Sequence, residues 1–362
     1  MNHTLTSHRP ELFQQLLDIL RASTDPSAYR LQLPRALLVL LYIVKELSTA
    51  RLTRTRQNLQ SITPEILTVL GTIYLNKVQA WQDFLRDGGE DEGGAMESIE
   101  TSLLAIKTIR RLVIAGYDFP AREVEVQRLW TMSRQYFGEF FHYVNFDSPL
   151  EESVRKLIEK HLMQLSKFHL TMATTHPAGF VLLPNSLNLV RDYWSLCSKL
   201  GETWGSKSVD GAKIGNDGDA DDDTPIVERL GLKGLLIIRA CVKMVFHPAQ
   251  SFRYKQQKEK DERDQAVEMV KSQLLTDDLV RDMVSALVTR FFVFRPSDLR
   301  MWEEEPDEWE KMEEGGGEDW EFAIRPCAEK LFLDLAKNFK DLIVQPLLQV
   351  FYTVASGCSP LD

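Results

Sequence analysis

The stretch IETSLLAIKTIRRLVIAGY, residues 99–117, shows the spacing of apolar residues that decides the fold class. Ile99, Leu103 and Ile106 recur every three or four positions and therefore share one face of a helix, because an α-helix turns once in about 3.6 residues. The same spacing recurs elsewhere, for example in residues 328–335. No stretch alternates apolar and polar residues between hairpin turns. The sequence therefore predicts an all-α protein.

Twelve helices are predicted from this period, and several have recognisable start signals. They span residues 10–21, 33–48, 63–86, 97–116, 122–143, 149–173, 184–203, 226–247, 261–275, 277–294, 320–337 and 339–357. Thr63-Pro64 and Ser148-Pro149 each place a capping residue before a proline at the first helical position, and Thr276 precedes two aspartates. Consecutive helices with one apolar face each are buried either in a bundle or by stacking as antiparallel pairs.

The number of helices favours a stacked array. Twelve helices exceed one bundle core, whereas two helices in every roughly 40 to 50 residues is the period of HEAT-type repeats. We therefore expect a right-handed α-α superhelix, a HEAT-repeat solenoid with a single array over residues 1–362, about five complete helix pairs and a half-repeat at each end. The strongly apolar last helix predicts that the array continues beyond it. Flexible inserted loops are expected at residues 87–95, 205–224 and 303–319.

Composition narrows the classes of function. With 362 residues, of which 44% are hydrophobic, the chain can bury a continuous core. Its formal net charge of −10 argues against nucleic acid as the main ligand, because phosphate binding needs a basic surface, and it favours basic protein partners. The longest apolar run, residues 36–44, is far shorter than the roughly 20 residues that span a membrane, so a soluble chain is expected.

No catalytic residue, metal ligand or cofactor site is predicted. Reduced thiols in an intracellular compartment are expected from four widely separated cysteines without a CxxC pair, Cys197, Cys241, Cys327 and Cys358. His161 and His169 lie eight positions apart on a predicted helix without a ligand partner, and we interpret them as helix-surface or core-edge residues. The sequence has no phosphate-binding loop and no nucleophile elbow, so we expect no enzyme.

Residues 217–228, DGDADDDTPIVE, resemble a calcium-binding loop but depart from it at two positions. Carboxylates occupy loop positions 1, 3, 5, 7 and 12. Asp222 replaces the glycine that makes the sharp turn, and Pro225 stiffens the ninth position. A solvated acidic loop is the favoured interpretation. A calcium or metal binder is the alternative.

The segment from Trp302 to Trp320 concentrates the charge of the chain. Between Glu303 and Glu321, eleven acidic residues and one lysine give a net charge of −10, so the remaining residues are neutral as a whole. Disorder explains the carboxylates and glycines of this segment but not its three tryptophans, whose exposure to water is costly. We expect a protein-binding segment in which Trp302 and Trp320 anchor the two ends on flanking helices while the middle is mobile.

The candidate protein-binding residues come from this segment and from one basic stretch. Residues 50–57, ARLTRTRQ, suit an acidic partner, although a solvated loop explains them as well. The candidates are Trp302, Glu303, Glu304, Glu305, Asp307, Glu308, Trp309, Glu313, Glu314, Glu318, Asp319, Trp320, Arg51, Arg54 and Arg56.

Two patches of sequence resemble importin-β-type nuclear transport receptors, the karyopherins. The first runs from LVTRFFVFRPSDLRMW, residues 287–302, through EEEPDEW to WEFAIRPCAEKLFLDL, residues 320–335. The second, residues 40–62 followed by residues 103–117, is similar to the importin-11 group and its fungal counterparts. Glu305-Pro306 departs from the Asp-Pro of many members. The chain thus resembles an N-terminal-to-central stretch of a fungal receptor of the importin-11 branch.

This resemblance implies a superhelical receptor, not an enzyme, that carries protein cargo through the nuclear pore. The cargo is expected to be basic, with phenylalanine-glycine nucleoporins as further partners and with release when Ran-GTP binds, an interaction weak or absent for this stretch. The resemblance also implies no cofactor, no nucleic acid or membrane partner, a monomer, and shuttling between cytoplasm and nucleus at the nuclear envelope. A HEAT-repeat scaffold that organises another protein complex is the alternative.

Overall fold

Contacts between helices divide the chain into two units, Met1–Gly179 and Phe180–Asp362. The structure, a computed structural model, describes residues 10–22, 32–87, 92–145, 151–205, 224–246, 257–314 and 319–357. Within these ranges all regular structure is helical, which confirms the predicted class. No helix in the same ranges has the length and hydropathy needed to cross a membrane.

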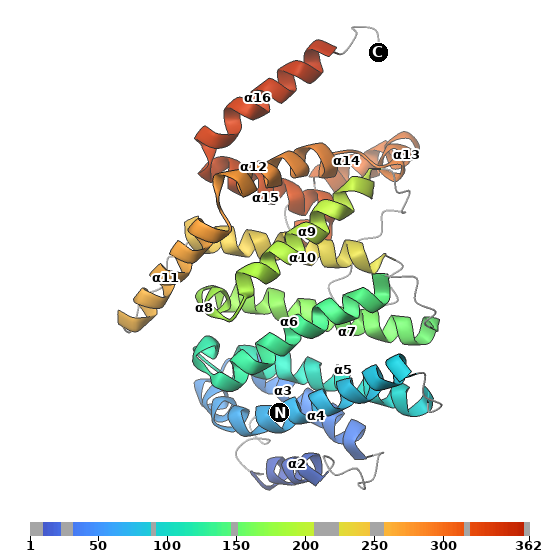
Figure 1. Ribbon diagram of the computed structural model, residues 1–362, viewed down its shortest axis with the longest axis vertical. Helices are drawn as coiled ribbons and strands as arrows, with labels where there is room; N and C mark the ends of the chain where they lie inside the picture. Colours follow the sequence, from blue (N-terminus) through green and yellow to red (C-terminus); the bar gives the residue numbers. More distant parts are fainter. Residues whose placement is uncertain are drawn as a thin grey trace. The chain divides into compact units, whose positions relative to one another are not determined.

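The first unit stacks its helices in two layers. Its helices are α2 (Pro10–Ala22), α3 (Gln32–Thr49), α4 (Thr53–Asp87), α5 (Glu92–Ala115), α6 (Val124–Asn145) and α7 (Glu152–Thr175), with the short 3-10 helix η1 (Pro120–Arg122) before α6. α3, α5 and α7 contact one another in succession, while α4 packs on α5 and α6 packs on α7 (Figure 1). This is the pairing of neighbours that a repeat array predicts.

Helix α5 explains why the opening sequence folds as it does. Ile99, Leu103 and Ile106 of the predicted stripe are buried, with 1%, 7% and 2% of their surface exposed. Other faces of α5 are also covered, because α3, α4 and α7 all contact it. Its end needs a glycine, since a Cβ atom on Gly116 would lie 2.2 Å from Thr63 Oγ1.

The second unit is also helical, and its first residue, Phe180, lies inside the short helix α8 (Pro177–Leu182). α8 precedes α9 (Ser186–Trp204), α10 (Ile226–Phe246), α11 (Gln257–Gln273), α12 (Asp277–Ala286), the π-helical turn η2 (Leu287–Phe291), α13 (Pro296–Glu304), α14 (Pro306–Glu314), the 3-10 helix η3 (Asp319–Phe322), α15 (Ile324–Asn338) and α16 (Lys340–Gly357). α10 packs between α9 and α15, and α15 also contacts η2 and α16.

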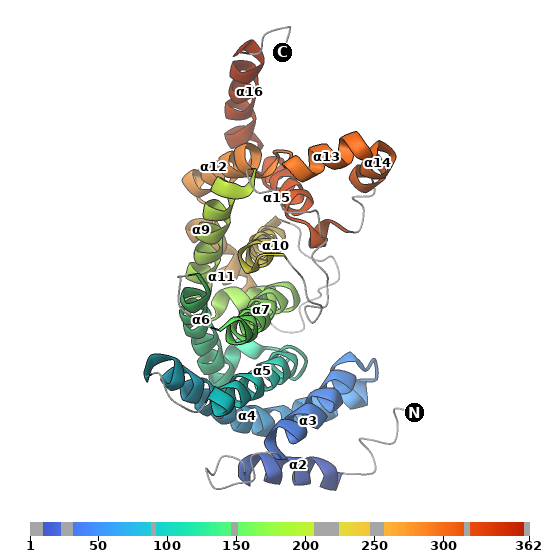
Figure 2. The same cartoon turned by 90° about the vertical axis from the view of Figure 1, so that its right-hand side faces the viewer.

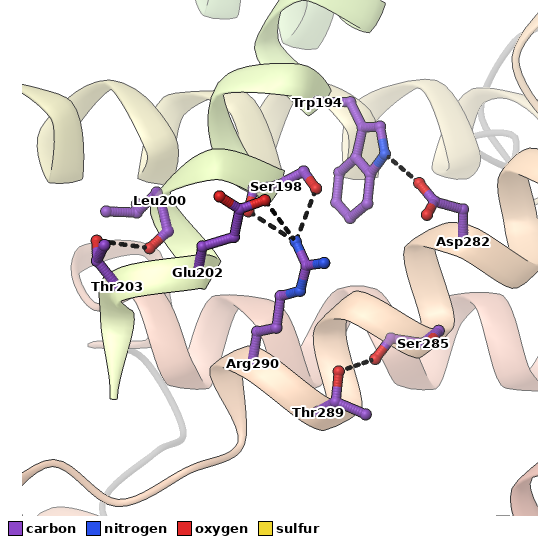
Figure 3. A network of polar contacts seen from close by, with 9 residues as sticks. All are labelled: Trp194, Ser198, Leu200, Glu202, Thr203, Asp282, Ser285, Thr289 and Arg290. Atoms are coloured by element: carbon purple, nitrogen blue, oxygen red, sulfur yellow. Dashed lines mark hydrogen bonds and ion pairs between the residues drawn. The ribbon is translucent and has the colours of Figure 1, made fainter. Parts of the chain in front are cut away.

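Polar contacts join α9 to α12 and η2 (Figure 3). The Trp194 indole Nε1 donates to Asp282 Oδ2 at 2.8 Å. Arg290 Nη1 donates to the Ser198 carbonyl at 2.9 Å and to its hydroxyl at 3.0 Å. The two elements approach closely because position 201 is glycine, where a Cβ atom would lie 3.0 Å from Arg290 Cδ. The π-helical turn therefore has specific partners that hold it against α9.

One predicted helix start was wrong. The Thr63-Pro64 pair was expected to cap a helix, but α4 begins at Thr53 and Pro64 lies inside it. Thr63 is fully buried and its hydroxyl donates to the Leu59 carbonyl at 2.7 Å. The helix continues past the proline because the buried face that contains Leu59 and Ile66 packs in the core. By contrast, Thr276 lies at the N-cap of α12 as predicted.

The predicted loops differ from the structure in two places. Residues 92–95 belong to α5, and residues 303–314 form the end of α13 and all of α14, joined at Glu305, rather than a flexible loop. Most of the predicted loop at 205–224 and the cap at Ser148-Pro149 lie outside the described residues. The helix predicted over 277–294 ends at Ala286 and passes into η2. A single array of five complete pairs stays a prediction.

Candidate protein-binding surface

Arg295 attaches the start of α13 to α9 and α10. Its backbone N–H donates to Asp298 Oδ2 at 2.8 Å, which caps α13. Its Nη2 lies 3.0 Å from Glu228 Oε2 on α10, and its guanidinium carbon lies 3.2 Å from the centre of the Trp204 ring on α9. Only 9% of the Arg295 side chain and 3% of the Glu228 side chain are exposed. Removing either partner would leave a buried charge uncompensated, so this contact holds α13 firmly.

Helices α13 and α14 meet at a corner rich in carboxylates, which we call the acidic corner (residues 296–314). The backbone N–H of Glu305 donates to the Met301 carbonyl at 2.8 Å, and that of Trp309 donates to the Glu305 carbonyl at 3.0 Å. Pro306 begins α14 and two acidic residues follow it, an arrangement that favours a helix N-terminus. Figure 2 shows the corner to one side of α12 and α15.

The aromatic residues of the acidic corner are arranged differently from the prediction. The Trp309 ring lies 5.9 Å from the Phe294 ring and 6.2 Å from the Trp302 ring, measured between centroids. Trp309 is half-buried, whereas Trp302 is 56% exposed and Phe294 is 48% exposed. Trp302 is therefore not the predicted anchor, because its exposed ring contacts Trp309 of the corner itself. Trp309 is the inner residue of the pair.

The other end of the segment is attached by its tryptophan, but to α10 rather than to one of the predicted flanking helices. The half-buried Trp320 lies beneath two cations of α10, with the Arg239 guanidinium carbon 4.0 Å and Lys243 Nζ 5.7 Å from its ring centre. Arg239 Nε in turn lies 2.6 Å from Asp334 Oδ2 on α15. Burial and the neighbouring Arg239 lower the pKa of the Lys243 ammonium, an effect that the carboxylates of Asp334 and Glu321 partly oppose. The predicted mobile middle includes residues 315–318, which lie outside the described residues.

The candidate carboxylates of the acidic corner point outward. All five are exposed, and none forms an ion pair with another residue of the described ranges: Glu303, Glu304, Glu305, Asp307 and Glu308. Glu313 and Glu314 belong to α14 and Asp319 to η3, while Glu318 lies outside the described residues. The structure therefore places an exposed indole and an open row of negative charge on the same two helices.

The basic candidates lie elsewhere, in the first unit. Arg51 precedes α4, and Arg54 and Arg56 lie at its start, so this stretch is largely helix rather than the solvated loop considered above. Arg56 Nη2 lies 2.7 Å from Asp118 Oδ1, and both side chains are 58% exposed. An exposed ion pair of this kind contributes little to stability.

The two histidines are core residues, contrary to the prediction of helix-surface or core-edge positions. His161 Nε2 lies 3.0 Å from the Tyr74 hydroxyl, His169 Nε2 lies 3.2 Å from the Ser133 hydroxyl, and neither histidine is exposed. Burial lowers the pKa of each imidazole to about 3. Both rings are therefore neutral at pH 7. The described residues hold no group of three side chains placed to bind a metal ion.

Two further predictions concern thiols and calcium. Cys197, Cys241 and Cys327 are buried and free, as expected, and burial raises the pKa of Cys241 and of Cys327 to about 12. Cys358 lies outside the described residues, as do residues 217–223 of the calcium-like sequence. Its last carboxylate, Glu228, is the partner of Arg295. The residue that would supply the last ligand of a calcium loop is therefore already engaged.

Comparison with known proteins finds similarity to importin-type proteins over most of the chain. No family model matches the chain. It is 29% identical over 322 residues to the importin beta-like protein KAP120 of Saccharomyces cerevisiae, covering 88% of this chain and 28% of that protein. It is 23% identical over 349 residues to importin-11 of Homo sapiens, covering 95% of this chain and 32% of that protein. The resemblance to importin-11-type karyopherins is confirmed.

A solved structure supports the same relationship. Lph2 of Saccharomyces cerevisiae, described as a bidirectional nuclear transport receptor, matches with a TM-score of 0.76 and 26% identity over 95% of this chain and 31% of that one. This similarity to a karyopherin confirms the predicted helical solenoid class. The chain spans about a third or less of the length of these karyopherins, between 28% and 32%.

Sequence reasoning missed the residues that position the acidic corner. Arg295 and Glu228 are 67 positions apart, so their pairing has no local signature. The Arg-Pro-x-Asp order at Arg295 does have one, because proline at the first helical position and aspartate at the third are start signals for α13. Arg239 carries no such signal.

Proposed function

We propose that this chain is part of a nuclear transport receptor, which binds protein cargo and passes with it between cytoplasm and nucleus. The observation that carries the proposal is the similarity, over 88% to 95% of the chain, to importin beta-like proteins and to a solved transport receptor. The stacked helices support it. Each repeat of a solenoid contacts only its neighbours, so small changes at many interfaces adapt a long surface to different cargo.

The proposed partners are protein cargo, phenylalanine-glycine nucleoporins and Ran-GTP, and the receptor is proposed to act as a monomer at the nuclear envelope without catalysing a reaction. The net charge of −10 favours basic cargo. Attraction between exposed charges fades over about 8 Å at physiological salt, so cargo association is expected to weaken as salt is raised. This chain alone is expected to bind Ran-GTP weakly or not at all, because it spans only 28% to 32% of its relatives.

The test uses the full-length protein. Bead-bound Ran loaded with GTP is mixed with the receptor and a captured basic cargo, and Ran loaded with GDP is the control. Transport function predicts binding of Ran-GTP, displacement of the cargo, and neither result with Ran-GDP. If Ran-GTP neither binds nor displaces cargo, the transport proposal is wrong, and a scaffold that organises another protein complex is favoured instead.

A further inference from the structure

We propose that the outer edge of α13, formed by Leu299, Trp302 and the adjacent Phe294, binds a segment of a protein partner that carries both basic and apolar side chains. The inference rests on the proposed function only for identifying that partner as transported cargo. Binding of the peptide itself is a property of the surface and is tested separately from transport.

The apolar part of this edge is open to solvent. Phe294, Leu299 and Trp302 are 48%, 44% and 56% exposed. Leu299 and Trp302 are three positions apart on α13 and are therefore neighbours on its surface. Trp309 contacts both aromatic rings and joins them into one apolar strip. Scattered exposed apolar residues are ordinary, but adjacent ones that include an indole are typical of a contact surface.

The charge beside the strip selects the chemistry of its partner. Glu303 and Glu304 follow Trp302 on α13, and contact between Trp302 and Trp309 brings the first turn of α14, with Asp307 and Glu308, next to it. A guanidinium or ammonium group that reaches the carboxylates can lie against the exposed indole face, which attracts cations. Arginine suits the site best, because its planar head group can stack on the ring and bind a carboxylate through two hydrogen bonds.

Two other classes of ligand fit less well. Nucleic acid is repelled, since its phosphates would face carboxylates. Within the residues that the structure describes, no three acidic side chains converge as a cation site requires, so the carboxylates form an open row rather than a metal cage. An open row beside an apolar strip matches an extended peptide whose basic and apolar side chains point to different parts of the surface.

The strip is also held in place before any ligand arrives. Arg295, at the N-cap of α13, is attached to Glu228 at 3.0 Å and stacks on Trp204 at 3.2 Å. Phe294, one residue earlier, has the Arg325 guanidinium carbon 4.8 Å from its ring centre. A surface that is already ordered loses less conformational entropy when it binds.

The experiment measures fluorescence anisotropy of a short fluorescein-labelled peptide of alternating arginine and leucine, titrated with the 362-residue chain. Trp302→Ala and the triple variant E303Q/E304Q/E308Q are each expected to weaken binding about tenfold, from loss of the indole face or of three exposed charges. Trp302→Phe keeps an aromatic face and is expected to retain most of the affinity.

One control variant and one control peptide test whether binding depends on these carboxylates and on arginine. The variant D261N/D264N/E268Q removes the same number of exposed charges from α11 and is expected to bind the peptide like the unmodified chain. A peptide of alternating glutamine and leucine is expected to bind at least tenfold more weakly. Equal losses in the two triple variants, equal binding of the two peptides, or unchanged binding by Trp302→Ala would each overturn the proposal.

Failure of this site and failure of transport are distinguishable. If the chain binds the peptide through Trp302 but the full-length protein does not respond to Ran-GTP, the proposed function is wrong and the peptide site stands. If cargo is released by Ran-GTP but the Trp302 and carboxylate variants bind the peptide normally, transport stands and this site is wrong.

Discussion

The two ends of the acidic segment are built differently although each has a tryptophan. Trp320 is half-buried under Arg239 and Lys243 of α10, whereas Trp302 is 56% exposed beside carboxylates that have no ion-pair partner among the described residues. At one end, cations of the same chain occupy the indole face. At the other end, the equivalent place is open. The difference indicates that the chain satisfies one end itself and leaves the other for a partner.

Removing the contact at Arg295 is expected to have the largest effect, because this contact holds the end of the segment that contains Trp302 in place. Arg295→Ala is expected to lower the free energy of unfolding by about 4 kcal/mol, since Glu228 would stay buried without a partner. Urea unfolding measures the free energy of unfolding, and hydrogen exchange measures the local protection of the backbone of α13. The double variant Arg295→Met with Glu228→Met removes both charges and is expected to recover most of the loss. If Arg295→Ala has the same free energy of unfolding as the unmodified chain and the same hydrogen exchange in α13, the contact does not hold α13.

Acidification is expected to distinguish the two units by destabilising the first. His161 and His169 of the first unit are buried with pKa values lowered to about 3, whereas unfolded histidine titrates near 6.5. The unfolded chain therefore binds more protons between those values, and stability present above pH 6.5 is lost as the pH falls. At pH 5 each histidine is expected to cost about 2 kcal/mol. Thermal unfolding at pH 5 and pH 7 measures this, and equal midpoints for the first unit would contradict neutral buried rings.

The tryptophans themselves give the next largest effect. Trp320→Ala removes a partly buried ring and its contacts with two cations, and we expect a loss of about 2 kcal/mol in the free energy of unfolding. Trp302→Ala is expected to cost less than about 1 kcal/mol, because the ring is already exposed. Urea midpoints of the two variants, compared at pH 7, measure the difference. Equal losses would remove the distinction between the two ends.

The smallest effect on stability is expected from the carboxylates. E303Q/E304Q/E308Q should change the free energy of unfolding by less than about 0.5 kcal/mol, because these side chains are exposed and form no ion pair within the described residues. Thermal unfolding checks this result in low and high salt. A large loss would mean that the carboxylates stabilise the chain rather than serve a partner.

Much of the fold was predictable because it depends on local periodicity. The stripe on α5 followed from apolar spacing, and the partial burial of Trp320 followed from the cost of an exposed indole, although its partner α10 did not. The acidic corner was mistaken for a loop because its composition is typical of disorder, although glutamate is a good helix former and Pro306 stands at a helix start.

The remaining errors have a common physical cause. Pro64 was expected to start a helix, but burial of the α4 face outweighs the cost of a proline inside it. The contact between Arg295 and Glu228 joins residues 67 positions apart, so only tertiary structure reveals it. Sequence periodicity locates helices, whereas the ends of helices and the contacts that position a site depend on packing between distant segments.

Hydroxyl-radical footprinting with mass spectrometry tests the central claim most directly, that Trp302 is open and Trp320 is covered. In the free chain we expect rapid oxidation of Trp302 and slow oxidation of Trp320. Addition of the arginine-leucine peptide is expected to protect Trp302 and leave Trp320 unchanged. Equal oxidation of the two tryptophans in the free chain, or no protection of Trp302 at saturating peptide, would contradict the claim.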